Sequence, residues 1–252
     1  TGKTSMMLKN MVGYLLNETD ENILLLAYTN RAVDEICGAI DDLDKLAHNE
    51  YIRIGSRNST HPRYHDRLLN TLLEDVNKRD ELKELLESHR IFVATVASMA
   101  SKQELMHFKK FQRVIIDEAS QILEPMIVGM LPFFERFILI GDHQQLPAIV
   151  VQDKSNSSIE DTELQAIGLT DCRNSLFERL YKRCISENWD WAYAQLSHQR
   201  RMHEEVMEFS SEQFYKNALK VLPKGTQRHI ESFGHFCLRQ RLLVSCDGEA
   251  RA

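Results

Sequence analysis

The stretch Val114-Ile115-Ile116-Asp117-Glu118-Ala119-Ser120 decides the fold that the sequence predicts. Its three β-branched residues indicate a short buried strand, and two carboxylates follow at once. A parallel sheet presents its ligand-binding groups at the carboxyl ends of its strands. Asp117 is suited to hold Mg²⁺ through water, and Glu118 is suited to take a proton from a water molecule that attacks a phosphate. The alternative is an ordinary surface pair of carboxylates at a strand end.

Apolar runs on both sides of this stretch extend the same pattern. They predict further strands at 22–28, 91–96, 136–140 and 241–246. Helical patterns lie at 5–16, 32–46, 67–88 and 121–131. Strands that alternate with helices are typical of an α/β fold around a parallel sheet, which is the fold class we expect. The interval 41–90 is too long for a simple crossover and spaces its leucines helically, so we expect a helical insertion there.

The first four residues, Thr1-Gly2-Lys3-Thr4, match the last part of the phosphate-binding pattern G-x-x-x-x-G-K-[ST]. A helical pattern follows them directly. In a complete loop of this kind, backbone N–H groups such as that of Gly2 cradle phosphate oxygens, the lysine neutralises their charge, and the threonine hydroxyl binds Mg²⁺. The alternative is a chance G-K-T in a surface turn.

The run Phe137-Ile138-Leu139-Ile140-Gly141-Asp142-His143-Gln144-Gln145-Leu146-Pro147 repeats the design of a buried strand that leads into polar residues. Gln145 is suited to sense a γ-phosphate, because its amide can donate to a phosphate oxygen and accept from attacking water. The alternative is a plain exit from strand to loop.

Two adjacent arginines lie in the stretch Leu196-Ser197-His198-Gln199-Arg200-Arg201-Met202-His203, which opens a predicted helix that runs to Tyr215. Arg201 is a candidate arginine finger, because a guanidinium stabilises the charge that develops on a transferred phosphoryl group. The alternative is a solvated turn, where pairs of arginines are common.

Composition restricts the possible classes of function. The 252 residues carry a net charge of -6, which argues against a protein that coats nucleic acid through its overall charge. The residues between Arg53 and Arg67 could form a local basic groove or an ordinary solvated loop. The five cysteines show no C-x-x-C spacing, and no apolar run reaches the roughly 20 residues that cross a bilayer. We expect no zinc site, no membrane association and an intracellular, cytoplasmic location.

The four stretches with candidate nucleotide-binding residues follow one another along the chain, with Lys3 in the first, Asp117 in the second, Asp142 in the third and Arg201 in the fourth. In this the chain resembles the superfamily 1 helicases, specifically the 5′-to-3′ branch that contains the nonsense-mediated mRNA decay helicase and its DNA-processing relatives. Two further motifs of that branch are matched, by Thr29-Asn30-Arg31-Ala32-Val33-Asp34 and by Ala94-Thr95-Val96-Ala97-Ser98.

The resemblance implies a P-loop NTPase with a RecA-like parallel sheet and a helical insertion, truncated at both ends. It implies that residues 1–218 form the first RecA-like domain without its first strand, with the insertion at 41–90. A linker would follow at 219–240, and a second RecA-like domain would begin at 241–252. We expect this stretch alone to be inactive.

The resemblance also implies a function and the residues that serve it. ATP and Mg²⁺ would be the cofactors, and hydrolysis would drive a monomeric helicase or translocase along single-stranded DNA or RNA. The alternative is an ATP-gated clamp or scaffold without unwinding activity. Nucleotide would bind at Gly2, Lys3, Thr4 and Arg200, with Mg²⁺ at Thr4 and Asp117. Catalysis would use Glu118, Gln145 and Arg201, and the nucleic-acid backbone would contact Asn30, Thr95 and Ser98.

The chain departs from the family pattern at Q-Y-R-M-H-P. Arg200 stands where the family has the tyrosine that stacks on the nucleotide base, and Glu204 stands in place of the proline. A planar guanidinium can also stack on a base, so we expect ATP binding to survive with altered base selectivity.

Overall fold

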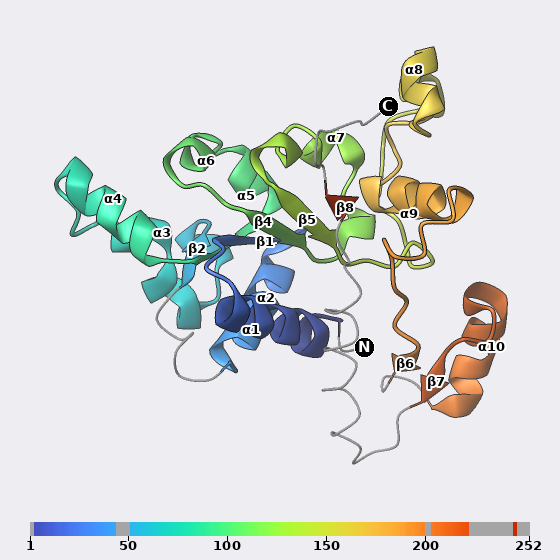
Figure 1. The fold of residues 1–252 in the computed structure, drawn as a ribbon, viewed down its shortest axis with the longest axis horizontal. Coiled ribbons are helices and arrows are strands. Elements are labelled where there is room, and N and C mark those ends of the chain that lie inside the picture. The colour runs from blue at the N-terminus through green and yellow to red at the C-terminus, as the bar shows by residue number, and fades with distance from the viewer. Residues whose placement is uncertain (1–2, 44–50, 200–202, 222–243, 246–252) are drawn as a thin grey trace.

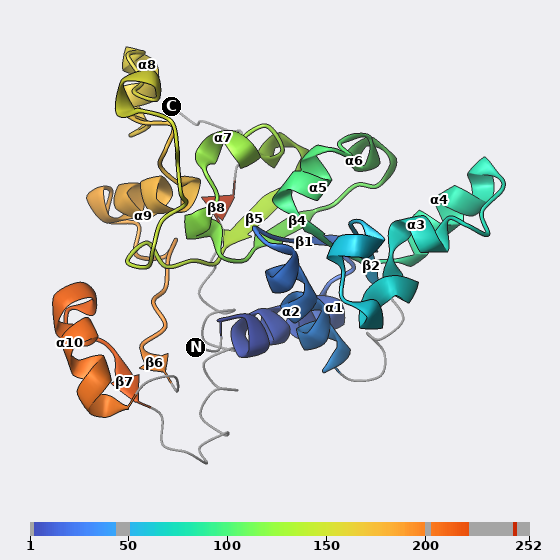
Figure 2. The same ribbon diagram turned by 180° about the vertical axis from the view of Figure 1, so that it is seen from behind.

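The computed structural model describes residues 3–43, 51–199, 203–221 and 244–245, with Lys3–Ser5 and Val244–Ser245 described by their backbone alone. Figures 1 and 2 show the chain from opposite sides, with helices on both faces of a central sheet.

The central sheet contains five parallel strands within the described residues. They are β1 (Ile23–Ala27), β2 (Tyr51–Ile54), β3 (Ile91–Thr95), β4 (Arg113–Ile116) and β5 (Arg136–Leu139). Their order in space is β2-β3-β1-β4-β5, and β8 (Val244–Ser245) adds an antiparallel edge. The predicted parallel sheet is confirmed. Four of its five parallel strands fall where the apolar runs placed them, and β8 falls within the predicted strand at 241–246.

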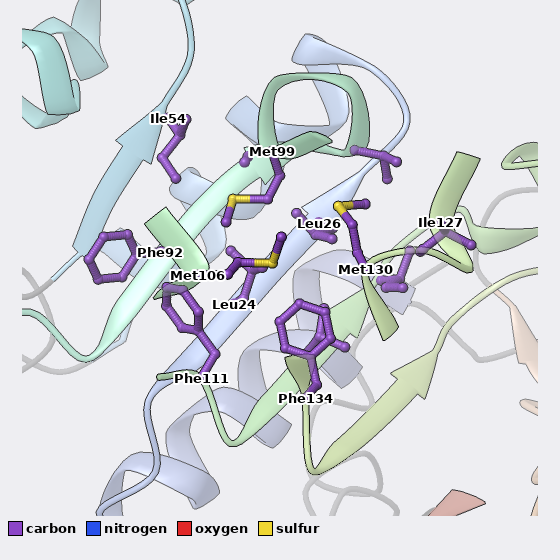
Figure 3. Close-up of a cluster of buried hydrophobic side chains, with 14 of the residues drawn as sticks. Leu24, Leu26, Ile54, Phe92, Met99, Met106, Phe111, Ile127, Met130 and Phe134 are labelled. Carbon is purple, nitrogen blue, oxygen red and sulfur yellow. The ribbon is translucent and has the colours of Figure 1, made fainter. Parts of the chain in front are cut away.

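Alternate residues of each strand face opposite sides of the sheet, so one apolar run supplies two cores. Leu24 and Leu26 pack against α5 (Val96–Ala100), α6 (Glu104–Phe108) and α7 (Glu124–Ile127). Figure 3 shows this core, with Met99, Met106 and Met130 gathered around Leu24 and Leu26 and with Phe92, Phe111 and Phe134 beside them. Residues of this size each contribute about 1.5–3 kcal/mol when fully buried.

The opposite face of the sheet is covered by two helical segments, the continuous segment 3–18 and α2 (Asn30–Asp41). Ile23 and Leu25 point to this side, where they meet the π-helical turn η1 (Lys3–Leu8), α1 (Lys9–Glu18) and α2. Figure 1 shows α1 and α2 below the sheet and α5, α6 and α7 above it. Because β1 is buried on both faces, the residues that follow its ends are the ones that can reach a ligand.

The segment 41–90 is not the purely helical insertion that the sequence predicted. Tyr51–Ile54 forms β2, the edge strand next to β3. Helical structure follows it in the short η2 (Arg57–Ser59), η3 (Pro62–Arg67) and α3 (Leu69–Leu72), and in α4 (Arg79–Ser88). The strand was missed because Arg53 interrupts its apolar pattern, whereas in the structure this arginine is fully buried beside Asp34.

The remaining elements follow β5. They are the short η4 (Ala119–Gln121), η5 (Leu131–Phe133) and η6 (Lys154–Asn156), then α8 (Thr162–Ala166), α9 (Leu176–Ser186), β6 (His198–Gln199), α10 (Glu204–Tyr215) and β7 (Lys220–Val221). Both views show β6, β7 and α10 apart from the sheet (Figures 1 and 2). The pairing of Val244 and Ser245 with β5 brings residues that the sequence assigned to a second domain onto this sheet.

At the amino ends of the strands, Glu21 links two of them. Its carboxylate accepts two hydrogen bonds from Arg113, at 2.6 and 2.9 Å, and one from Arg136 at 2.9 Å. Burial acts to raise the pKa of Glu21, but the hydrogen bonds and charges of the two arginines outweigh it and lower the pKa below the ordinary 4.5. A carboxyl with a lowered folded-state pKa stabilises the fold above its ordinary pKa and loses this effect as the pH falls.

We expect Glu21→Gln to lower the free energy of unfolding at pH 7, because it leaves two arginines without their shared charge partner. The difference from wild type should begin to shrink as the pH falls below the ordinary pKa of about 4.5, and it should be lost once the pH passes the lowered pKa at which the folded carboxyl is protonated. Urea unfolding at several pH values measures it, with the exposed Glu18→Gln as control. A difference that stays constant with pH would contradict the assignment.

Candidate functional site

The carboxyl ends of β4 and β5 lie against each other and carry the first group of polar residues. The N–H of Ile140 donates to the carbonyl of Ile116, and the N–H of Ala119 donates to the carbonyl of Ile140, both at 2.8 Å. Gly141 permits this approach, because a Cβ there would lie 2.9 Å from the backbone nitrogen of Ser120. The two turns are therefore held as one rigid edge.

The two carboxylates after β4 differ in their surroundings. Asp117 is 0% exposed, and its Oδ1 accepts the N–H of Glu118 at 2.9 Å. Glu118 is partly exposed and has a left-handed backbone with φ of 52°. Such a conformation is uncommon and costly for a residue with a side chain, and residues that adopt it are enriched at functional sites. It turns the chain sharply after Asp117.

Asp142 organises the turn after β5. Its Oδ1 accepts the N–H of Gln144 at 3.1 Å, and its Oδ2 accepts the side-chain amide of Gln145 at 2.8 Å. Its own N–H donates to the Ser120 hydroxyl at 3.2 Å. Gln145 is thereby held by a carboxylate of its own turn and joined to the residues that follow β4.

A cleft of about 1050 Å³ opens beside Asp142 and Gln145. Its lining includes Met7 from η1, Gln199 from β6 and Tyr215 from α10. One wall is aromatic, since the His143 ring lies 4.6 Å from the Tyr181 ring and Tyr181 lies 5.4 Å from Tyr193. The cleft thus joins the turn after β5 to the elements on either side of the predicted arginine pair.

A second polar group lies at the carboxyl ends of β1 and β3. Ala27 pairs with Thr95, so Asn30 and Ser98 each follow three residues beyond paired positions. Thr95 caps α5, with its Oγ1 accepting the N–H of Ser98 at 3.0 Å and donating to the Ser98 hydroxyl at 2.8 Å. Asn30, Thr95 and Ser98 therefore lie at one edge of the sheet.

Several predicted site residues lie outside what the structure describes. Gly2, Arg200 and Arg201 are outside the described residues, and of Lys3 and Thr4 only the backbone is described, at the start of η1. The meeting of Lys3 and Arg201 with Glu118 and Gln145 around one triphosphate therefore stays a prediction.

The interval from Arg53 to Arg67 is not a continuous basic groove. Arg53 is fully buried beside Asp34, Arg63 pairs with Asp41 at 3.1 Å, and Arg67 lies over the Tyr51 ring. Most of this positive charge is used within the fold.

The donor chemistry at the end of β4 fits Mg²⁺. Asp117 offers hard carboxylate oxygens beside a partly exposed second carboxylate. The described residues hold no group of three or more His, Cys, Asp or Glu side chains placed as a metal cage. Mg²⁺ is commonly bound by one or two protein ligands together with water and substrate phosphates, which matches this sparse set. No described helix is long and apolar enough to span a membrane.

Comparisons with known proteins agree with this arrangement. Two family models, each described as an AAA domain, match residues 66–153 and 172–251. The mouse protein named DNA replication ATP-dependent helicase/nuclease DNA2 is 34% identical over 227 residues, which cover 87% of this chain and 18% of that protein. This chain is therefore related to DNA-processing helicases. The expected P-loop NTPase fold is thereby confirmed.

More distant members of the helicase family show similar coverage. The Arabidopsis thaliana DNA replication ATP-dependent helicase/nuclease JHS1 is 31% identical over 87% of this chain and 14% of its own length. The protein named DNA2 in Saccharomyces cerevisiae is 29% identical over 87% of the chain and 13% of its own length. The chain therefore spans less than a fifth of these helicases.

Tyr215 is a residue of the cleft that the sequence did not reveal. Its hydroxyl donates to Oδ2 of Asp142 at 2.7 Å, across 73 positions of sequence. Burial, followed by the hydrogen bond to the Asp142 carboxylate and its charge, raises the pKa of Tyr215 well above the ordinary value, so the hydroxyl stays a donor. A tyrosine at a helix end gives no such signal in one sequence, because its partner is set by folding.

We expect Tyr215→Phe to loosen α10 without changing the central sheet. Losing a hydrogen bond of about 1 kcal/mol should speed amide hydrogen exchange in α10 by about fivefold. Hydrogen–deuterium exchange with mass spectrometry measures it, with Tyr193→Phe as control because that hydroxyl bonds to the nearby Asp190. Unchanged exchange in α10 would show that the bond does not attach the helix.

Proposed function

We propose that this chain is part of an ATP-hydrolysing motor of superfamily 1 that moves along single-stranded nucleic acid. One observation carries the proposal: neighbouring strand ends of one parallel sheet hold two different polar groups. Asp117, Glu118 and Gln145 follow β4 and β5, whereas Asn30 and Ser98 follow β1 and β3. Nucleotide chemistry and strand contact would then share one rigid edge, which suits a protein that couples the two.

The residues after β4 and β5 would act on the triphosphate. Asp117 would hold Mg²⁺, which neutralises phosphate charge when bound. Glu118, one residue beyond it, would take the proton from the attacking water. Gln145, held by Asp142, would contact the γ-phosphate and the same water.

Residues that lie outside the described part of the chain, or of which only the backbone is described, would complete the nucleotide site. Gly2, Lys3 and Thr4 would bind phosphate, with Thr4 sharing Mg²⁺. Arg201 would stabilise the charge that develops on the transferred phosphoryl group. Arg200 would stack on the base. The lining of the cleft by Met7 and Gln199 supports this, since these residues lie close in sequence to Lys3 and Arg200.

The names of the similar helicases favour DNA over RNA as the strand, because they describe DNA replication proteins. We propose 5′-to-3′ movement by a monomer inside the cell. In the proposed domain division, 1–218 is the first RecA-like domain, 219–240 a linker and 241–252 the beginning of the second. Hydrolysis would change the separation of these two domains and so advance the strand.

We expect Glu118→Gln in the full-length protein to lower strand-stimulated phosphate release by at least about 100-fold, the usual scale for losing a general base. Binding of a non-hydrolysable ATP analogue should persist, because the neutral amide keeps the size of the side chain. Glu135→Gln, on the surface beside Lys110, is the control and should keep wild-type release.

Two outcomes would change the proposal. Undiminished release by Glu118→Gln would remove the residue from the chemistry. Phosphate release by the wild type that single strands do not stimulate would argue against a motor. Measurement of duplex unwinding in the same reactions separates a helicase from an ATP-gated clamp.

A further inference from the structure

Arg53 is a charged residue in the interior of the edge strand β2. It is 0% exposed, and its neighbours Ile52 and Ile54 are equally buried. An arginine keeps its charge in a protein, so a buried guanidinium needs partners for its N–H groups. The turn after β2 is shaped around it, since a Cβ at Gly55 would lie 2.7 Å from Nη1 of Arg53.

The side-chain partners of Arg53 come from the first turns of α2, and its Nη1 donates to the carbonyl of Ile54 at 3.4 Å. Its Nε and Nη2 each lie 3.0 Å from Oδ1 of Asp34, and its Nη2 donates to Oδ1 of Asn30 at 3.4 Å. The second oxygen of Asp34 accepts the N–H of His61 at 3.2 Å. The Arg53–Asp34 pair therefore ties β2, the start of α2 and the loop before η3 to each other.

The contact with Asn30 fixes the direction of its amide. A side-chain amide has one oxygen, which accepts, and one NH2 group, which donates. With the oxygen turned toward Arg53, the NH2 group is turned away from the guanidinium. Phosphate oxygens only accept hydrogen bonds, so this orientation offers a strand backbone the donor it requires. Thr29 holds the backbone at this point by capping α2 through the N–H of Ala32 at 3.1 Å.

We propose that Arg53, held by Asp34, is a positioning residue that keeps the N–H donors of Asn30 directed at the nucleic-acid backbone. Arg53 acts through Asn30 and does not itself touch the strand. The inference rests on the proposed function, since it gives a mechanism to one of the strand contacts. It also gives a function to the buried charge of Arg53, which has no role in the proposed nucleotide chemistry.

The test measures binding of a fluorescent oligo(dT) to the full-length protein by anisotropy, for Arg53→Lys, Asn30→Ala and the double variant. Lysine keeps the charge but cannot bond Asp34 and Asn30 together. Each single variant should bind about 3- to 10-fold more weakly, as for the loss of one hydrogen bond. The double variant should bind no more weakly than Asn30→Ala, because both changes remove the same contact.

Arg113→Lys is the matched control. Arg113 is also a buried arginine in this sheet with a carboxylate partner, Glu21, but it lies at the amino ends of the strands. Arg53→Lys and Arg113→Lys should both lower the melting temperature, and only Arg53→Lys should weaken strand binding. Equal weakening of binding by the two would reduce Arg53 to a purely structural role and overturn the proposal.

Asn30→Asp keeps the proposal testable if Arg53→Lys fails to fold. The aspartate retains an acceptor for Arg53 but replaces the N–H donors with an oxygen that repels phosphate. It should keep the wild-type melting temperature and bind oligo(dT) more weakly than Asn30→Ala. Binding equal to wild type would overturn the proposal.

The salt dependence of binding separates positioning from direct contact. A lost phosphate contact by a cation lowers the slope of log affinity against log salt by about 0.7 for a single strand. Arg53→Met should leave this slope unchanged if Arg53 acts only through Asn30, and a lower slope would overturn the proposal. If wild type binds but Arg53→Lys and Asn30→Ala weaken binding independently, only this inference fails. If wild type does not bind strands, the proposed function fails with it.

Discussion

The pairing of β1 with both of its neighbours is the constraint on which the rest of the structure depends. All five of its residues are buried, and it pairs in parallel with β3 and β4 along nearly its whole length. A strand that is enclosed by two neighbouring strands and two layers of helices can present polar side chains only at its ends. The registers of Ala27 with Thr95 and of Leu26 with Ile116 align these ends, so the turns beyond them form one polar edge.

Charged side chains are buried near both ends of the strands, and each is neutralised by a partner of opposite charge. Glu21 joins Arg113 and Arg136 at the amino ends of the strands, whereas Arg53 and Asp34 lie toward the carboxyl ends. Breaking such a pair leaves an uncompensated charge, so its geometry is strongly maintained. At the amino ends this stabilises strand packing alone. Near the carboxyl ends the same physics fixes the direction of the partly buried Asn30 amide.

The cleft beside Asp142 depends on elements that are far apart in the chain. Its floor comes from the turn after β5, one wall from α9 and the aromatic residues around it, and another from α10. The single carboxylate of Asp142 bonds both Gln145 and Tyr215. The position of α10 is thus coupled to the glutamine that we propose contacts the γ-phosphate, and a shift of the helix would alter the geometry of that glutamine.

The sequence alone determined β1, β3, β4 and β5, because short apolar runs followed by polar residues have few other stable arrangements. It also located Asp117, Glu118, Asn30 and Thr95 at strand ends, since these positions follow directly from where the runs stop. It did not predict β2, because Arg53 is unfavourable in a buried strand until Asp34 lies beside it.

The tertiary structure alone decided the remaining contacts of the site. Two hydrogen bonds show this: Tyr215 bonds to Asp142, and Arg53 bonds to the amide oxygen of Asn30. In each case the separation of the two residues in the chain gives no information about their distance in space. Local pattern determines which segments become strands and helices, because that choice depends on neighbouring residues. Which side chains then meet depends on how those segments pack, and packing is a property of the whole chain.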